Sequence, residues 1–310
     1  MNILKLKPIY DKTIWANDVL TKMRHDDFEM GGTSWEVSAH PYNTNEIVNG
    51  EYAGKTLQYM VDNFHEEMIG NKTNDDLLRC AFLDAKNDLS IQVHPYQSYA
   101  KENDNDNGKT ESWYVLEASE DATLVAGTNN NDPKVIRKAI EDENLEQYLE
   151  YHHVKAGDFI HIPAGLLHAL GGGILAIEFG TNSNTTYRFY DYGRKDADGN
   201  GRELHLEKGF DVVNLDIHSE VTHHKMEGRK NNIEKLVECD NYTVELVDVV
   251  DEMTINNEQG FNALVCVYGE AEISDPETIN VKCTDSLFVP ASIKEYKIKG
   301  NCRIIRGYCK

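Results

Sequence analysis

The 310-residue chain has little proline and lacks long apolar runs. With 7 prolines and 22 glycines it falls outside the collagen and low-complexity classes, and 40% hydrophobic residues can supply a packed core. No apolar run reaches the roughly 18 residues that a membrane-spanning helix needs. Residues 1–8 lack the apolar stretch and cleavage site of a secretory signal. The sequence therefore predicts a globular, cytoplasmic protein.

Positive charge is also scarce. The chain has 31 Lys and Arg residues against 53 Asp and Glu residues, which gives a formal net charge of −22. Nucleic acids and anionic membranes would be repelled, so we expect neither as a partner and favour a small molecule. The field of the whole protein would oppose an anionic substrate, which would need a local cluster of positive groups.

The six cysteines form no Cys-x-x-Cys pair, and five of them lie in the last quarter of the chain. A zinc site made of thiolates normally uses closer pairing, and a reducing compartment does not favour disulfides. We therefore expect small buried side chains at Cys80, Cys239, Cys266, Cys283, Cys302 and Cys309.

Short strand-like segments dominate the hydrophobic pattern, at residues 89–94, 113–116, 123–126, 158–162 and 174–179. Two segments have helical spacing instead. One covers residues 55–70, and the other begins at Asp132-Pro133, an N-cap followed by a first-turn proline, and runs to Glu150. Many short strands at close spacing favour an antiparallel barrel or sandwich. The predicted fold is therefore all-β with helical insertions.

The chain becomes almost entirely strand-like from about residue 229, which predicts two domains, residues 1–228 and residues 229–310. An internal repeat supports the division: the segment 157–164 (Gly-Asp-Phe-Ile-His-Ile-Pro-Ala) has a counterpart at 284–291 (Thr-Asp-Ser-Leu-Phe-Val-Pro-Ala). Five residues after the proline, the first copy has His168 and the second has Glu295. We expect the second domain to lack the site that His168 helps to form.

Four residues of the first domain can form a metal site. Gln92 and His94 are two apart in a strand, so their side chains point to the same face. Glu111 begins the next strand, where a hairpin would bring it beside His94, and His168 follows the turn at 163–165. This set of nitrogen and oxygen ligands suits zinc first, with iron or manganese as alternatives.

The spacing Gly157-x5-Pro163-x-Gly165-x2-His168 is similar to the second signature of the cupin superfamily. Gln92-x-His94 with Glu111 resembles the first signature, with one histidine replaced by glutamine. Four ordered blocks resemble, more narrowly, the short bacterial form of the type I mannose-6-phosphate isomerase family. They are Leu-Ser-Ile-Gln-Val-His-Pro at 89–95, Gly-Lys-Thr-Glu-Ser-Trp-Tyr at 108–114, Ile-Pro-Ala-Gly-Leu-Leu-His-Ala at 162–169 and Thr-Thr-Tyr-Arg-Phe-Tyr-Asp-Tyr at 185–192.

The resemblance implies two cupin jelly-roll barrels and an isomerase that interconverts mannose 6-phosphate and fructose 6-phosphate. The residues that it implies are Gln92, His94, Glu111 and His168 as zinc ligands, Arg188 as a catalytic residue, and Ser90 and Lys109 as phosphate-binding residues. Moving a carbonyl between C1 and C2 passes through an enediolate, whose oxygens a metal ion and an arginine can stabilise. A surface ion pair with Asp191 is the alternative role for Arg188, and the proton-transfer base stays open between Glu178, Asp191, His161 and a metal-bound water.

Three segments depart from the family. Relatives usually carry Trp-Gly-Gly where this chain has Trp15-Ala-Asn, Gly-Glu where it has Gly-Thr33, and a lysine where it has Ala81. The missing lysine leaves three alternatives. The phosphosugar binds weakly, Arg79 or another basic residue replaces the lysine, or the substrate is a different or unphosphorylated sugar. A sugar-binding or regulatory cupin with little turnover, and a cupin iron oxygenase, are the rival functions.

A further pattern, from Asp196 to Glu207, matches the ligand spacing of a calcium-binding EF-hand loop. The segment before it, residues 187–192, is strand-like, whereas an EF-hand loop follows a helix. We therefore expect a polar turn that leads into a helix at about 206–215.

Overall fold

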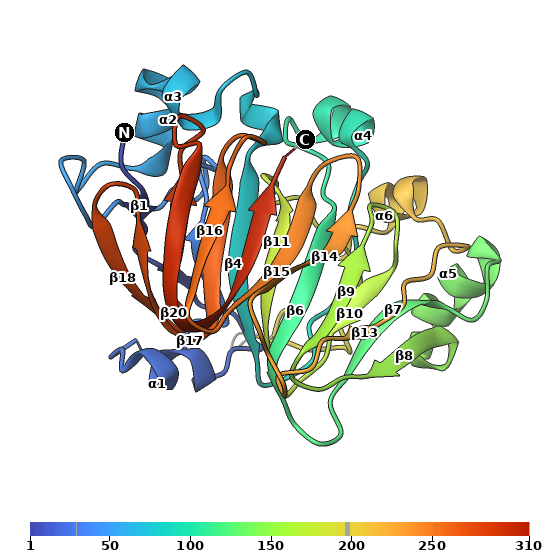
Figure 1. Ribbon diagram of the computed structural model, residues 1–310. Coiled ribbons are helices and arrows are strands. Elements are labelled where there is room, and N and C mark those ends of the chain that lie inside the picture. The colour runs from blue at the N-terminus through green and yellow to red at the C-terminus, as the bar shows by residue number, and fades with distance from the viewer. Residues whose placement is uncertain (29, 196–198, 310) are drawn as a thin grey trace.

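The computed structural model describes residues 1–28, 30–195 and 199–309, and within them the chain is mostly β with a few short helices (Figure 1). Its strands form three antiparallel sheets. The seven-stranded sheet has the order β13-β9-β6-β11-β4-β3-β2. Its strands are β2 (Ile9–Asp11), β3 (Thr33–Val37), β4 (Leu78–Ala85), β6 (Glu111–Ala118), β9 (Asp158–Ile162), β11 (Ile174–Thr181) and β13 (Thr222–His223).

A five-stranded sheet covers one face of the seven-stranded sheet. Its order is β12-β5-β10-β7-β8, with β5 (Ile91–Val93), β7 (Thr123–Thr128), β8 (Leu149–His153), β10 (His168–Leu170) and β12 (Tyr187–Tyr190). Apolar side chains from both sheets form one buried cluster between them, which includes Leu83, Trp113, Leu124, Ile160 and Leu170. The polar residues of the candidate site, described below, lie next to this apolar cluster.

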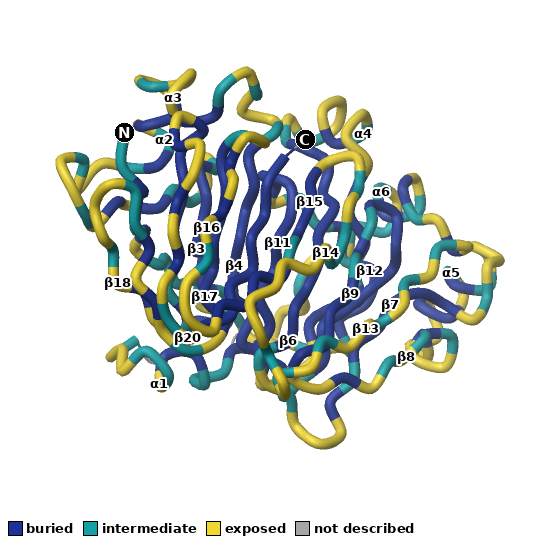
Figure 2. The backbone as a smooth tube through the Cα atoms, viewed as in Figure 1, coloured by how far each residue is buried: buried dark blue, intermediate teal, exposed yellow. Residues whose placement is uncertain are grey.

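An eight-stranded sheet packs on the other face of the seven-stranded sheet. It contains β1 (Leu4–Lys5), β14 (Asn232–Glu238), β15 (Thr243–Val249), β16 (Glu252–Asn256), β17 (Asn262–Ser274), β18 (Thr278–Lys282), β19 (Ser286–Val289) and β20 (Glu295–Tyr308). Phe82 and Phe179 pack with Phe288 and Ile305 in the cluster between these two sheets. Because layers cover both faces, all eight residues of β4 and all eight of β11 are buried (Figure 2).

The helices lie outside the sheets (Figure 1). They are α1 (Val19–Arg24), α2 (Leu57–Asn63), α3 (His65–Ile69), α4 (Gln97–Asn103), α5 (Pro133–Glu141) and α6 (Leu206–Val212). The helix predicted over 55–70 is divided in two at Phe64. The helix predicted to reach Glu150 begins as expected, with the Asp132 side chain accepting a hydrogen bond from the Lys134 N–H, but α5 ends at Glu141. Glu143 has a positive φ of 54°, which is incompatible with a continuing helix.

Both copies of the internal repeat form strands, β9 in the seven-stranded sheet and β19 in the eight-stranded sheet. The first strand of the chain, β1, pairs with β19 through Leu4 and Phe288. All six cysteines are free, and four of them are buried. No helix in the described part of the chain is both long and apolar enough to cross a membrane.

Candidate active site

Three polar side chains lie in one row across the five-stranded sheet. In its register, Gln92 on β5 is opposite His168 on β10 and also opposite Arg188 on β12. Neighbouring strands lie about 4.8 Å apart, and directly opposed side chains point to the same face of a sheet. Gln92 Nε2 is accordingly 3.4 Å from His168 Nε2. The row therefore brings two of the predicted metal ligands and the predicted catalytic arginine together.

Glu111, the first residue of β6, faces this row from the seven-stranded sheet. One of its carboxylate oxygens is 3.4 Å from His94 Nε2, and the other is 3.4 Å from His168 Nε2. All three side chains are buried, with potential ligand atoms within 4.8 Å of one another. The predicted hairpin between the strands of His94 and Glu111 is wrong, because β5 and β6 belong to different sheets. The two residues meet across the interior instead.

Backbone carbonyls orient both imidazoles. His94 Nδ1 is 2.9 Å from the Thr185 carbonyl oxygen, and His168 Nδ1 is 2.8 Å from that of Leu166. A carbonyl can only accept, so each Nδ1 carries the hydrogen, and each Nε2 presents a lone pair toward Glu111. This arrangement is typical of metal-binding histidines, whose second nitrogen is held by a hydrogen bond.

The protonation states also suit a cation. Burial, with the neighbouring Lys109, lowers the pKa of His94 to about 3. Burial alone would raise the pKa of Glu111, but Lys109 and His94 hold it well below its usual range. His94 Nε2 and Glu111 Oε1 are buried and make no hydrogen bond to any group that the structure describes, and such atoms are costly unless a ligand satisfies them. Together with His168, these residues fit a divalent metal ion.

Alternating charges continue from the ligand cluster along the inner face of the seven-stranded sheet. Lys109 Nζ is 2.6 Å from a Glu111 oxygen and 3.4 Å from Glu178 Oε1, and Arg79 Nη2 is 2.9 Å from the same Glu178 oxygen. Gly180 lies between Arg79 and Glu111 in the register and carries no side chain that would separate them. The Arg79 guanidinium carbon is 4.3 Å from the Trp35 ring centroid, a cation–π contact that holds the guanidinium at the wall.

A cavity of about 480 Å³ reaches this charged row, and its walls include Gln92, Lys109 and Glu178. The cations that line it are Lys12, Arg79, Lys109, Arg188 and Arg202. Ser90 is also in the wall, and its hydroxyl oxygen accepts a hydrogen bond from Arg188 Nε at 3.3 Å. In a chain with a net charge of −22, this is the local positive cluster that an anionic ligand requires.

Comparison with known proteins agrees with this geometry. Residues 3–131 match the catalytic domain of type I phosphomannose isomerases, and residues 232–309 match the cupin domain of mannose-6-phosphate isomerases. The mannose-6-phosphate isomerase ManA of Bacillus subtilis is 33% identical over 309 residues, which cover 97% of this chain and 97% of that protein. The chain belongs to the type I mannose-6-phosphate isomerase family. The resemblance found in the sequence is thereby confirmed.

Two further relatives extend the comparison. The mannose-6-phosphate isomerase of Streptococcus mutans is 32% identical over 96% of this chain and 95% of its own length. The crystal structure of the Bacillus subtilis mannose 6-phosphate isomerase matches with a TM-score of 0.91 at 31% identity, covering 99% of this chain and all of that chain. The fold is therefore that of the cupin-type isomerase family.

Two of the departures from the family lie near the cavity. Thr33 lines it, as does Trp15, the residue before the Ala-Asn departure, and Ala81 lies opposite Trp35 and Glu178 in the register. Arg79 is two residues before Ala81 on the same strand, so both face the same side. The guanidinium of Arg79 is thus on the wall to which a side chain at position 81 would also point.

The three side chains considered as the proton-transfer base lie in different places in the structure. Glu178 lines the cavity. His161 lies outside it and contacts Ser112, with its Nδ1 3.0 Å from the hydroxyl oxygen. Asp191 accepts hydrogen bonds from Arg194 and Arg202. The alternative ion pair between Arg188 and Asp191 is not among the ion pairs of the described residues, and Arg188 Nη1 instead donates to the Glu203 carbonyl at 2.7 Å.

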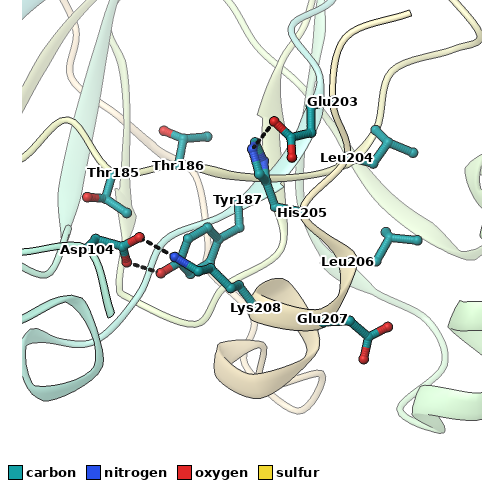
Figure 3. A pocket seen from close by; sticks show the side chains of 10 residues that line it. All are labelled: Asp104, Thr185, Thr186, Tyr187, Glu203, Leu204, His205, Leu206, Glu207 and Lys208. Carbon is teal, nitrogen blue, oxygen red and sulfur yellow. Dashed lines mark hydrogen bonds and ion pairs between the residues drawn. The ribbon is translucent and has the colours of Figure 1, made fainter. Parts of the chain in front are cut away.

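Sequence reasoning missed Lys12 and Arg202 as cavity residues, because no motif marks them and the fold brings them in from distant segments. It also missed a second cavity of about 690 Å³, which shares Thr186 with the first (Figure 3). Asp196–Asp198 of the EF-hand pattern lie outside the described residues. The helix expected after that pattern is present as α6 but ends at Val212.

Proposed function

We propose that this chain interconverts mannose 6-phosphate and fructose 6-phosphate, with one zinc ion held by Gln92, His94, Glu111 and His168. The observation that carries the proposal is the buried cluster beside a cationic cavity, with His94 Nε2 and Glu111 Oε1 left without hydrogen bonds to described residues. Relatives from Bacillus and Streptococcus that are named mannose-6-phosphate isomerases support the same substrate.

The isomerisation removes a proton beside a carbonyl, forms an enediolate and returns the proton to the neighbouring carbon. When bound, zinc supplies a Lewis acid near the sugar oxygens. Arg188 is aimed into the same cavity and would stabilise the developing negative charge, a contribution of about 3–4 kcal/mol per well-placed donor. Of the three side chains considered as bases, Glu178 is the one on the cavity wall, so it remains the side-chain candidate for the proton transfer.

The phosphate group would bind Ser90 and Lys109, and Arg79 would supply the cation that relatives place at position 81. The support is positional: Arg79 shares its face with Ala81 and lines the same cavity as Ser90 and Lys109. Its contact with Trp35 holds the guanidinium there without a lysine. The substrate can then be phosphorylated despite the departure at Ala81.

We also propose that the fold divides into two jelly-roll barrels, residues 1–228 with the metal site and residues 229–310 without it. The strand order supports this division, because the eight-stranded sheet takes all of its strands except β1 from residues after 231. Limited proteolysis should cut between residues 224 and 232 before it cuts either sheet. Early cleavage inside β15 or β20 would contradict the division.

The direct test is a coupled assay with mannose 6-phosphate and free mannose side by side, on chelator-treated protein and on protein reloaded with zinc, manganese or iron. We expect turnover of the phosphorylated sugar alone, lost with the metal and best restored by zinc. Sugar binding without turnover would support a regulatory cupin. Consumption of oxygen would support an oxygenase.

The role of Arg79 has its own test. Arg79→Ala should lower kcat/KM for mannose 6-phosphate about 10- to 100-fold, chiefly through KM, because it removes a charge-assisted contact. Adding Ala81→Lys to Arg79→Ala should recover most of the loss, whereas Arg137→Ala on the surface of α5 should change nothing. If Arg79→Ala leaves KM unchanged, Arg79 does not bind the phosphate.

A further inference from the structure

Arg188 is held by a segment outside its own sheet. The strand β12 is an edge strand of the five-stranded sheet. One of its two sides pairs with β5, and the other faces away from the sheet. On the other side, the His205 N–H donates to the Arg188 carbonyl at 2.8 Å, and the Arg188 N–H donates to His205 Nδ1 at 3.1 Å. His205 thus provides both a donor and an acceptor, as a further strand would, but its acceptor is a side chain.

The same segment also holds the guanidinium. Arg188 Nη1 donates to the Glu203 carbonyl at 2.7 Å, while Nε donates to the Ser90 hydroxyl oxygen at 3.3 Å. The backbone and the charged end of Arg188 are therefore both bound to residues 203–205. A shift of this segment would move the guanidinium relative to the metal ligands.

The chemistry of the contact requires a neutral imidazole. The Arg188 N–H is a donor, so His205 Nδ1 must present its lone pair, and the hydrogen lies on Nε2. Burial and the nearby Arg188 lower the pKa of His205, which favours this neutral form. A protonated ring would lose the acceptor and place a second cation beside the guanidinium.

Neighbouring side chains keep the ring in place. Figure 3 shows His205 between Glu203 and Tyr187, at the wall of the second cavity. The Tyr187 ring is 6.3 Å from the His205 ring, centroid to centroid, and its hydroxyl donates to Asp104. Lys208 Nζ is 2.6 Å from the same carboxylate. The imidazole therefore lies against a tyrosine that is itself anchored, and not on a freely moving loop.

We propose that His205 is a positioning residue for Arg188: its neutral imidazole and backbone N–H complete the free edge of β12 and fix the guanidinium for the reaction. The inference rests on the proposed function for its kinetic consequence. Its structural content, the hydrogen bond from the Arg188 N–H to the His205 ring, is independent of any substrate.

Three variants separate this role from a general loss of structure. In His205→Asn the amide oxygen can occupy the place of Nδ1, and in His205→Leu no acceptor remains. His153→Leu is the matched control, because His153 is an exposed histidine on β8, the opposite edge strand of the same sheet. We expect His205→Leu to lower kcat about 10- to 100-fold with KM within about threefold, since a displacement of about 1 Å is worth about 100-fold in rate. His205→Asn should stay within about fivefold of the wild type.

Two measurements make the outcome decisive. Adding His205→Leu to Arg188→Met should cost little beyond Arg188→Met alone, because both remove the same function; additive losses would overturn the proposal. Independently of activity, hydrogen exchange of the peptide that contains Arg188 should be faster in His205→Leu and near wild-type in His205→Asn. Unchanged exchange would overturn the inference, whereas an inactive wild-type protein with the expected exchange would overturn only the proposed function.

Discussion

The two copies of the repeated turn have the same local geometry. In the first copy, Asp158 Oδ2 accepts a hydrogen bond from the Lys155 N–H at 2.9 Å. In the second, Asp285 Oδ2 accepts one from the Lys282 N–H at the same distance. An aspartate that binds the N–H three residues before it closes a compact turn ahead of each strand.

The surroundings of the two copies differ. The first leads to His168, which is fully buried among the proposed metal ligands, and the second leads to Glu295, an exposed residue at the start of β20. The buried cluster within the eight-stranded sheet is apolar and includes Val247, Leu264 and Ile304. A shared turn and strand therefore do not make a metal site, which depends on the polar side chains that the other strands bring to the same interior.

The largest effects are expected from substituting the residues that follow the two copies, His168 and Glu295. His168→Ala should remove bound metal and reduce isomerase turnover by more than about 100-fold, since loss of residues that only support ligands already costs 10- to 100-fold. Glu295→His should bind no metal, because position 295 is exposed, lies opposite Asn256 and belongs to no group of potential metal ligands among the described residues. Metal content by mass spectrometry and turnover should be measured on both. A metal-loaded His168→Ala protein would contradict the ligand assignment.

The two turn aspartates test whether the same hydrogen-bond geometry contributes equally to the free energy of unfolding. Asp158 is buried and also contacts His223 Nδ1 at 2.7 Å, whereas Asp285 is partly exposed and pairs with Lys5. Asp158→Ala should lower the free energy of unfolding by about 2–3 kcal/mol and Asp285→Ala by about 1 kcal/mol, because hydrogen bonds to buried charges contribute more. Urea denaturation monitored by circular dichroism would give both values. The reverse order would show that the interface with β1 dominates.

Buried carboxylates differ between the two halves as well. In the eight-stranded sheet Asp248 pairs with Arg303 at 2.8 Å, whereas Asp84 on β4 accepts the Leu20 N–H at 2.8 Å and leaves its Oδ1 without a hydrogen bond to described residues. Burial raises the pKa of Asp84 from 3.8 to about 6. The folded protein therefore takes up this proton more readily than the unfolded chain, and stability should fall as the pH rises from about 4 to about 6.

Asp84→Asn should remove that dependence. We expect a gain of about 1 kcal/mol in the free energy of unfolding at pH 7.5 and no gain at pH 4, where the carboxyl is already neutral in the folded state. Denaturant titrations of both proteins across this pH range would measure the difference. A variant that is less stable than the wild type at pH 7.5 would mean that the charge has a partner that outweighs its burial.

The smallest effect is expected where the two turns differ in backbone chemistry. Gly157 has a φ of 90°, and its counterpart Thr284 has a φ of 78°, a conformation that a β-branched residue rarely adopts. Arg24 Nε donates to the Thr284 hydroxyl oxygen at 3.1 Å. Thr284→Gly should relieve the backbone and lose this bond, so thermal unfolding should reveal a change below about 1 kcal/mol. A loss above 2 kcal/mol would show that the bond to Arg24 is the stronger effect.

The candidate site could be predicted where local spacing determines it. The two-residue step places Gln92 and His94 on one face, and the turn before His168 is set by its own glycine and proline residues. The hairpin predicted to bring Glu111 beside His94 failed because strand pairing is a long-range property, and β5 instead pairs with β10 and β12. Sequence spacing identified the site residues. The register that places Gln92 opposite both His168 and Arg188 could not be predicted from it, because that register depends on how the strands pair.

The fold class followed from the same kind of local evidence, because alternating apolar residues and short turns are visible in the sequence. The cavity wall did not follow. Lys12 and Arg202 are far apart in the chain and meet only after the sheets have stacked. Helix ends were also mispredicted, as at α5, because a positive φ at Glu143 ends the helix although apolar spacing continues to Leu149.

The pairing of β1 with β19 has a consequence for synthesis on the ribosome. Leu4 is translated long before its partner Phe288, because the two residues are far apart in the chain. Domains generally fold in order from the N-terminus as they emerge, and contacts between distant residues form late. The strand β1 must therefore wait unpaired until β19 has been translated, so this part of the eight-stranded sheet closes long after β1 has been made.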